Sequence, residues 1–220
     1  MMRVVYDVAE EEGLEPMYAL ELVGSGLGVC ELEPPSASGD SVQQNHPTVG
    51  RTPGGAIVDL GAAPGGWSQV AAERVRAVQG HGAVVAIDMH GIDPIPGVTI
   101  LHQDFYDADA PDALRQALGG KGADAVVSDM AAHATGHRQT DHFQVMGLAE
   151  AALEFAREVL NPGGTFIAKM QRGGTEAQLL AELKRDFATV RHVKPKSSRD
   201  VSSVLYLVAT GFRGVRSEGG

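Results

Sequence analysis

Three aspartates each close or directly follow an apolar segment of strand length. They are Asp88, Asp104 and Asp129. In a sheet of parallel strands the carboxyl ends meet at one edge, so we expect these three side chains to converge on one crevice. Carboxylates in such a crevice accept hydrogen bonds from the hydroxyl and amino groups of a nucleoside. Asp88 is placed to accept from a ribose diol, and Asp104 from an adenine amino group.

A glycine-rich turn precedes these aspartates and follows the first apolar segment. Its glycines are Gly61, Gly65 and Gly66, within the stretch Asp59–Trp67. Such a turn lets backbone approach a ligand closely, but it also occurs in dinucleotide-binding enzymes and in ordinary tight turns. Asp88 lies about twenty residues further on, at the position from which a carboxylate reaches a ribose. Since no phosphate need be bound here, the pattern favours an adenosine that carries a sulfonium over a dinucleotide.

Lys169 is the candidate base. It lies between the apolar run Phe166–Ala168 and the glycine pair Gly173-Gly174. Methyl transfer from a sulfonium is an in-line displacement, so an enzyme must align the acceptor hydroxyl and take its proton. A partly desolvated lysine can serve as that base, and Asp129 on the neighbouring strand could orient the amine or the hydroxyl. The competing interpretation is a lysine that merely extends from the rim of the sheet.

Strands and helices must alternate along the chain to position these residues. The sequence predicts strands at residues 56–60, 83–88, 98–101, 123–129, 165–170, 190–193 and 204–210, and helices at 67–78, 110–118, 141–160 and 175–187. The turn Asn161–Gly164 should separate the third helix from its strand, and Thr175 should cap the fourth. We therefore predict a Rossmann-like α/β fold: a mostly parallel seven-stranded sheet, an antiparallel hairpin at one edge, and helices on both faces.

The first part of the chain differs in composition from the rest. Residues 1–55 hold nine acidic residues against Arg3 and Arg51, are rich in turn formers, and offer only one candidate helix, near Tyr6 to Leu22. We predict an atypical acidic, loop-rich segment over 1–55, a catalytic domain over 56–214 and a flexible tail over 215–220.

Charge and composition exclude several classes of protein. The net charge of −10 argues against a wholly basic nucleic-acid surface, although all five lysines follow residue 120 and a local basic face remains open. The apolar runs are too short for a membrane span, and the single Cys30 forms no internal disulfide. The histidines near Asp141 lack metal-ligand spacing, so we expect no metal site. We expect a monomer in the cytoplasm, away from membranes.

Four ordered motifs make residues 55–214 resemble the FtsJ/RrmJ family of ribosomal RNA ribose 2′-O-methyltransferases. The motifs are Asp59-Leu-Gly-Ala-Ala-Pro-Gly-Gly-Trp-Ser-Gln69, Ser128-Asp-Met-Ala131, Pro162-Gly-Gly164 and Val193-Lys-Pro-Lys-Ser-Ser-Arg199.

This resemblance implies a cofactor, a substrate and a set of site residues. The cofactor would be S-adenosylmethionine, and the substrate a uridine ribose in the RNA of the large ribosomal subunit. The catalytic residues would be Lys169, as the base, and Asp129. The implied cofactor contacts are Gly65, Trp67, Asp88, Asp104 and Asp129, with Gly61 and Pro64 as further candidates near the cofactor.

The sequence also departs from the pattern of this family. The family carries a lysine before its first motif and a glutamate in its last strand, whereas this chain has no lysine before Lys121 and has Val204 at the place of the glutamate. His133 replaces a common asparagine. An alternative function is therefore a family member that binds the cofactor or RNA without efficient turnover. A third is a small-molecule methyltransferase, with residues 1–55 as material for a substrate lid.

Overall fold

The computed structural model describes residues 54–132, 136–171, 176–193 and 204–214. The predicted helix near Tyr6 to Leu22, the tail over 215–220, Thr175 and His133 all lie outside this part of the chain. The boundaries of the acidic segment and of the domain stay predictions. Within the described residues, no helix has the length and apolar character needed to cross a membrane.

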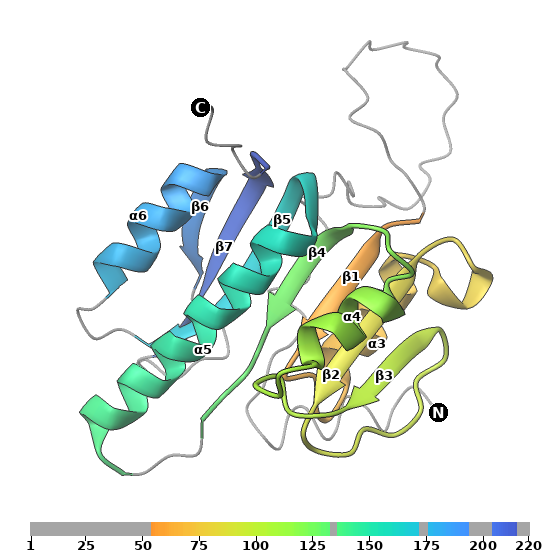
Figure 1. The fold of residues 1–220 in the computed structure, drawn as a ribbon, viewed down its shortest axis with the longest axis horizontal. Coiled ribbons are helices and arrows are strands. Elements are labelled where there is room, and N and C mark those ends of the chain that lie inside the picture. The colour runs from red at the N-terminus through yellow and green to blue at the C-terminus, as the bar shows by residue number, and fades with distance from the viewer. Residues whose placement is uncertain (1–53, 133–135, 172–175, 194–203, 215–220) are drawn as a thin grey trace, which may run out of the picture.

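A seven-stranded sheet forms the centre of the described fold (Figure 1). Its order is β3-β2-β1-β4-β5-β7-β6; the first five strands are parallel, and β7 runs antiparallel to both neighbours. This confirms the predicted mixed sheet with an antiparallel edge hairpin. The strands are β1 (Ala56–Leu60), β2 (Ala83–Asp88), β3 (Val98–His102), β4 (Ala123–Ser128), β5 (Leu160–Gln171), β6 (Phe187–Val193) and β7 (Val204–Phe212).

Helices cover both faces of the sheet, as predicted. The helices are α3 (Gly66–Arg74), the 3₁₀ helix η1 (Ala77–Gln79), α4 (Ala110–Ala117), α5 (Arg138–Val159) and α6 (Glu176–Asp186). Neighbouring strand residues point to opposite faces, so Val58 and Val85 join a core under α4, α5 and α6, while Ile57 and Val84 join a second core under α3. Both faces of the central strands are therefore buried, which explains their continuous apolar runs.

Several predicted boundaries are wrong. Helix α5 begins at Arg138 and β6 at Phe187, each three residues before the predicted start, and β7 ends at Phe212, two residues after its predicted end. Two further differences have a clear physical reason. The helix expected to reach Val78 ends at Arg74, because Arg76 adopts a left-handed φ of 56° and the chain restarts as η1. The strand expected from Thr165 begins at Leu160, directly after α5, so no separate turn stands between them. The residues predicted as a turn instead form an irregularity within β5. Gly163 has a φ of 87°, and the pairing with β4 shifts between Leu160 and Thr165.

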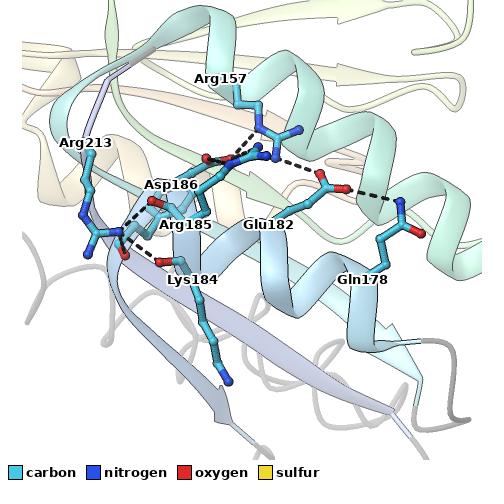
Figure 2. A network of polar contacts seen from close by, with 8 residues as sticks. Arg157, Gln178, Glu182, Lys184, Arg185, Asp186 and Arg213 are labelled. Carbon is cyan, nitrogen blue, oxygen red and sulfur yellow. Dashed lines mark hydrogen bonds and ion pairs between the residues drawn. The ribbon is translucent and has the colours of Figure 1, made fainter. Parts of the chain in front are cut away.

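A group of charged side chains fastens α6 to α5 and to the end of β7 (Figure 2). Arg157 on α5 donates to Glu182 at 2.8 Å and to Asp186 at 2.7 Å, both on α6. Arg213 donates to the main-chain oxygens of Lys184 and Arg185 at the carboxyl end of the same helix. A cation at this position satisfies carbonyls that lack helical partners and complements the helix dipole. The hairpin edge of the sheet is thus tied to the helices that cover it.

We predict that Arg157→Ala lowers the free energy of unfolding by about 1–2 kcal/mol, since it removes the guanidinium that two partly buried carboxylates share and leaves Asp186 with Arg185 and Glu182 with Gln178. Arg115→Ala is the matched control, because Arg115 bridges Asp112 and Glu158 on an exposed surface and its loss should matter much less. Urea unfolding of the two variants and the parent chain makes the comparison. Equal destabilisation by both substitutions would contradict the prediction.

Candidate active site

Asp59 on β1 lies fully buried beneath the carboxyl edge of the sheet. Its Oδ2 accepts a hydrogen bond of 2.6 Å from the Ser68 hydroxyl, whereas its Oδ1 has no hydrogen-bond partner among the described residues. Burial raises the pKa of Asp59 to about 7; the Ser68 bond opposes this shift, and the negative charges of Asp129 and Asp88 add to it. The contact with Ser68 fixes the first turn of α3 against β1, directly behind the glycine turn.

The glycine turn between β1 and α3 needs residues without side chains at two positions. Gly61 has a φ of 75°, and a Cβ there would lie 2.7 Å from backbone atoms of Met130. Gly65 has a φ of 112°, and its Cβ would lie 2.8 Å from Ile95. Both angles are in the region that favours glycine. Pro64 is exposed between them, and Trp67 is buried just after them, so the turn brings backbone to the surface of the crevice.

Asp88 and Asp104 stand at the ends of the neighbouring strands β2 and β3. Asp88 Oδ2 accepts a hydrogen bond of 2.9 Å from the Ala63 N–H, which ties β2 to the glycine turn. Its Oδ1 accepts from the His90 N–H at 2.7 Å and contacts His90 Nδ1 at 3.0 Å. Asp104 Oδ1 accepts from the Tyr106 N–H at 2.9 Å. Both carboxylates therefore lie at the same edge as the glycine turn.

The structure brings Lys169 and Asp129 together across β5 and β4. Lys169 Nζ lies 2.9 Å from Asp129 Oδ1 and donates to the Asp129 main-chain oxygen at 3.4 Å. The two side chains are only 15% and 18% exposed, so the pair is partly desolvated yet still reaches the surface. Asp129 itself is anchored, because its N–H donates to the Leu60 carbonyl at 3.0 Å.

Tyr206 completes this cluster and was missed as a site residue from sequence. It pairs with Lys169 across β5 and β7, and its hydroxyl donates to Asp129 Oδ1 at 2.7 Å. Burial and the negative charge of Asp129 raise the pKa of the Tyr206 phenol, so the hydroxyl stays protonated and donates. Its ring packs on Trp67 with centroids 5.4 Å apart. A tyrosine in an apolar strand is an ordinary core residue by pattern, so the sequence offered no signal for this contact.

The residues at this edge fit an adenosine that carries a sulfonium. The acceptors gathered there are carboxylates, the glycine turn leaves room for close backbone approach, and residues 54–73 contain no lysine or arginine that would favour a phosphate. The cofactor itself would add one positive charge beside a group of aspartates. By fold and by site, the protein is therefore a Rossmann-like methyltransferase.

The chain belongs to the FtsJ-like methyltransferase family, which matches residues 41–212. Membership of this family implies S-adenosyl-L-methionine as the cofactor. The family match covers both halves of the crevice, from the glycine turn to β7. It gives no support to the alternative of a member that has lost turnover.

Similar proteins agree with this family. A protein named Ribosomal RNA large subunit methyltransferase E from Xanthobacter autotrophicus is 62% identical over 158 residues, which are 72% of this chain and 62% of that protein. A protein of the same name from Afipia carboxidovorans is 62% identical over 161 residues, 73% of this chain and 71% of that protein. The chain thus spans slightly under two thirds of the first relative's length.

A solved structure is similar over the same region. It is described as a ribosomal RNA methyltransferase from Plasmodium falciparum, and it aligns at a TM-score of 0.64 with 30% identity. The alignment covers 73% of this chain and 88% of that one. The shared region supports the observed fold.

We predict that Gly61→Ala destabilises the fold by about 1–3 kcal/mol or more, because it forces a left-handed φ and an overlap with Met130. Gly80→Ala is the control: its φ is 73°, but nothing lies within 4 Å of the added Cβ. Urea unfolding should show the smaller loss, of about 1 kcal/mol, in the control. If both variants lose the same stability, the close approach of Gly61 to Met130 does not matter.

A second prediction concerns the pH dependence of stability. An unfolded aspartate loses its proton near about pH 4, while folded Asp59 keeps its proton to about pH 7. Over that range the unfolded state binds fewer protons, so the contribution of Asp59 to stability falls as the pH rises.

Asp59→Asn should therefore flatten this fall, which unfolding curves at about pH 5 and about pH 8 would reveal. Carboxylates with lowered pKa values, such as Asp186, make the stability rise with pH, but they do so equally in the parent chain and in Asp59→Asn. An unchanged difference between the two pH values would show that Asp59 does not keep its proton in the folded state.

Proposed function

We propose that this chain methylates a ribose 2′-hydroxyl in large-subunit ribosomal RNA, with Lys169 as the base. The observation that supports this most directly is the contact of Lys169 Nζ with two oxygens of Asp129. The names of the relatives, which refer to the RNA of the large ribosomal subunit, support the substrate. We propose that the unit that acts is the domain of residues 56–214, working as a monomer in the cytoplasm.

The contacts of Lys169 suit an amine that accepts a proton. A neutral amine has two N–H bonds and one lone pair, and Asp129 offers acceptors for both N–H groups, its Oδ1 and its main-chain oxygen. The lone pair then remains for the 2′-hydroxyl proton. Tyr206 holds Asp129 Oδ1 from the other side, which limits the directions in which Lys169 can turn. Positioning of this kind is a large part of what catalysis of a displacement requires.

The cofactor would lie along the carboxyl ends of β1 to β4. S-adenosylmethionine supplies a methyl group on a positively charged sulfur. Asp88 would accept hydrogen bonds from its ribose and Asp104 from its adenine, while Asp129 faces the transferred group. The glycine turn would contact the rest of the cofactor. The residues assigned to this contact are Gly61, Pro64, Gly65 and Trp67.

The direct test is methyl transfer from tritiated cofactor to large ribosomal subunits that lack this modification. Lys169→Ala should lower the single-turnover rate by about a hundredfold or more, the usual size of a lost acid–base contribution. Calorimetry with S-adenosylhomocysteine should show nearly unchanged affinity, because Lys169 acts on the hydroxyl and not on the cofactor.

Lys121→Ala is the matched control, since Lys121 is an exposed lysine that precedes β4 at the opposite edge of the sheet. It should transfer methyl groups like the parent chain. The assignment of Lys169 would be wrong if its alanine variant retained the parent rate. A parent chain that binds the cofactor but transfers nothing to subunits would contradict the proposed function itself.

A further inference from the structure

We infer that the His90 imidazole competes with the cofactor ribose for the Asp88 carboxylate, so that cofactor affinity rises as His90 loses its proton. The inference rests on the proposed role of Asp88 as the ribose acceptor. It assigns a function to a histidine that belongs to none of the catalytic or cofactor contacts above. When no cofactor is bound, the ring would occupy the position on Asp88 that a ribose hydroxyl takes.

The contacts of Asp88 leave too few free positions for a ribose diol. A carboxylate oxygen has two lone pairs, and Asp88 Oδ1 already faces the His90 N–H at 2.7 Å and the His90 ring nitrogen at 3.0 Å. Asp88 Oδ2 accepts from the Ala63 N–H, which leaves one lone pair there. The two hydroxyls of a ribose need two positions. One of the three present contacts must therefore be released when the diol binds to both oxygens.

The ring contact is the one that can be released. The other two contacts come from backbone N–H groups in the turns after β1 and β2, and those turns are fixed by the sheet. The His90 side chain is 64% exposed, while that of Asp88 is 10% exposed. A rotation about the side-chain bonds of His90 can therefore open a position on Oδ1 without moving the chain. The buried carboxylate stays where the ribose needs it.

Protonation decides how strongly the ring competes. A protonated imidazole donates from both nitrogens and forms an ion pair with Asp88, whereas a neutral ring forms at most a neutral hydrogen bond there. Two further titratable groups lie nearby: Asp59, on β1, interacts with Asp88, and His102, on β3, contacts the Met89 carbonyl at 3.0 Å. Removal of the proton from the ring should therefore weaken the competition.

Calorimetric titration with S-adenosylhomocysteine at about pH 6 and about pH 8 tests the inference. This probe has the ribose but lacks the sulfonium charge, so simple repulsion between cations is removed. The parent chain should bind several-fold more weakly at the lower pH. His90→Ala should bind more tightly than the parent at the lower pH and lose most of the pH dependence.

His102→Ala is the matched control, because His102 is an exposed histidine that pairs with Asp88 across β2 and β3, while its ring contacts the Met89 carbonyl. It should keep the pH dependence of the parent. A pH dependence that persists in full in His90→Ala would count against the inference.

Titrations near about pH 6.5 in two buffers of different ionisation enthalpy give a second readout, the number of protons released on binding. The parent should release a fraction of a proton, and His90→Ala much less. Equal affinities and equal proton release in the parent and His90→Ala would overturn the inference. Absence of binding by the parent at both pH values would instead refute the cofactor site.

Discussion

The Asp129 carboxylate connects the parts of the site, because it contacts both Lys169 and Tyr206. Asp129 follows β4, Lys169 lies on β5 and Tyr206 on β7, so one acidic side chain joins three strands at the edge of the sheet. The Tyr206 ring continues the connection to Trp67 and hence to the glycine turn. These contacts therefore connect the Lys169 amine to the glycine turn. A displacement reaction needs such alignment more than it needs new chemical groups.

This arrangement concentrates negative charge at one place. Burial, together with the negative charges of Asp129 and Asp88, raises the pKa of Asp59 to about 7. Lys169 offsets part of this charge from the side of β5. A ligand with a positively charged sulfur would offset more of it.

Much of the fold could be predicted because its signals are local. The central strands are short apolar runs with both faces buried, and each ends at a glycine turn or an aspartate, so β1, β2 and β4 were placed nearly to the residue. The start of β5 could not be predicted, because a glycine such as Gly163 is equally compatible with a turn and with an irregularity within a strand. Likewise the left-handed Arg76, which ends α3, has no marker in the sequence.

The places of the predicted site residues in the fold were predictable to the same extent, while their roles stay predictions. Lys169 and the strand-end aspartates follow from residue type and place, together with family resemblance. Tyr206 depends on β7 lying between β5 and β6, a pairing of distant segments that no local pattern encodes. The burial of Asp59 and the contact of His90 with Asp88 also arise only in the folded state, so the sequence alone does not predict them.

The central claim is that Lys169 and Asp129 act as one unit in proton removal, and a double-mutant cycle tests it most directly. Single-turnover methyl transfer would be measured at saturating cofactor for Lys169→Ala, Asp129→Asn and the double variant. If the pair acts as a unit, the double variant should be about as slow as the slower single variant. Losses that multiply in the double variant would show that the two residues act independently, and would contradict the account.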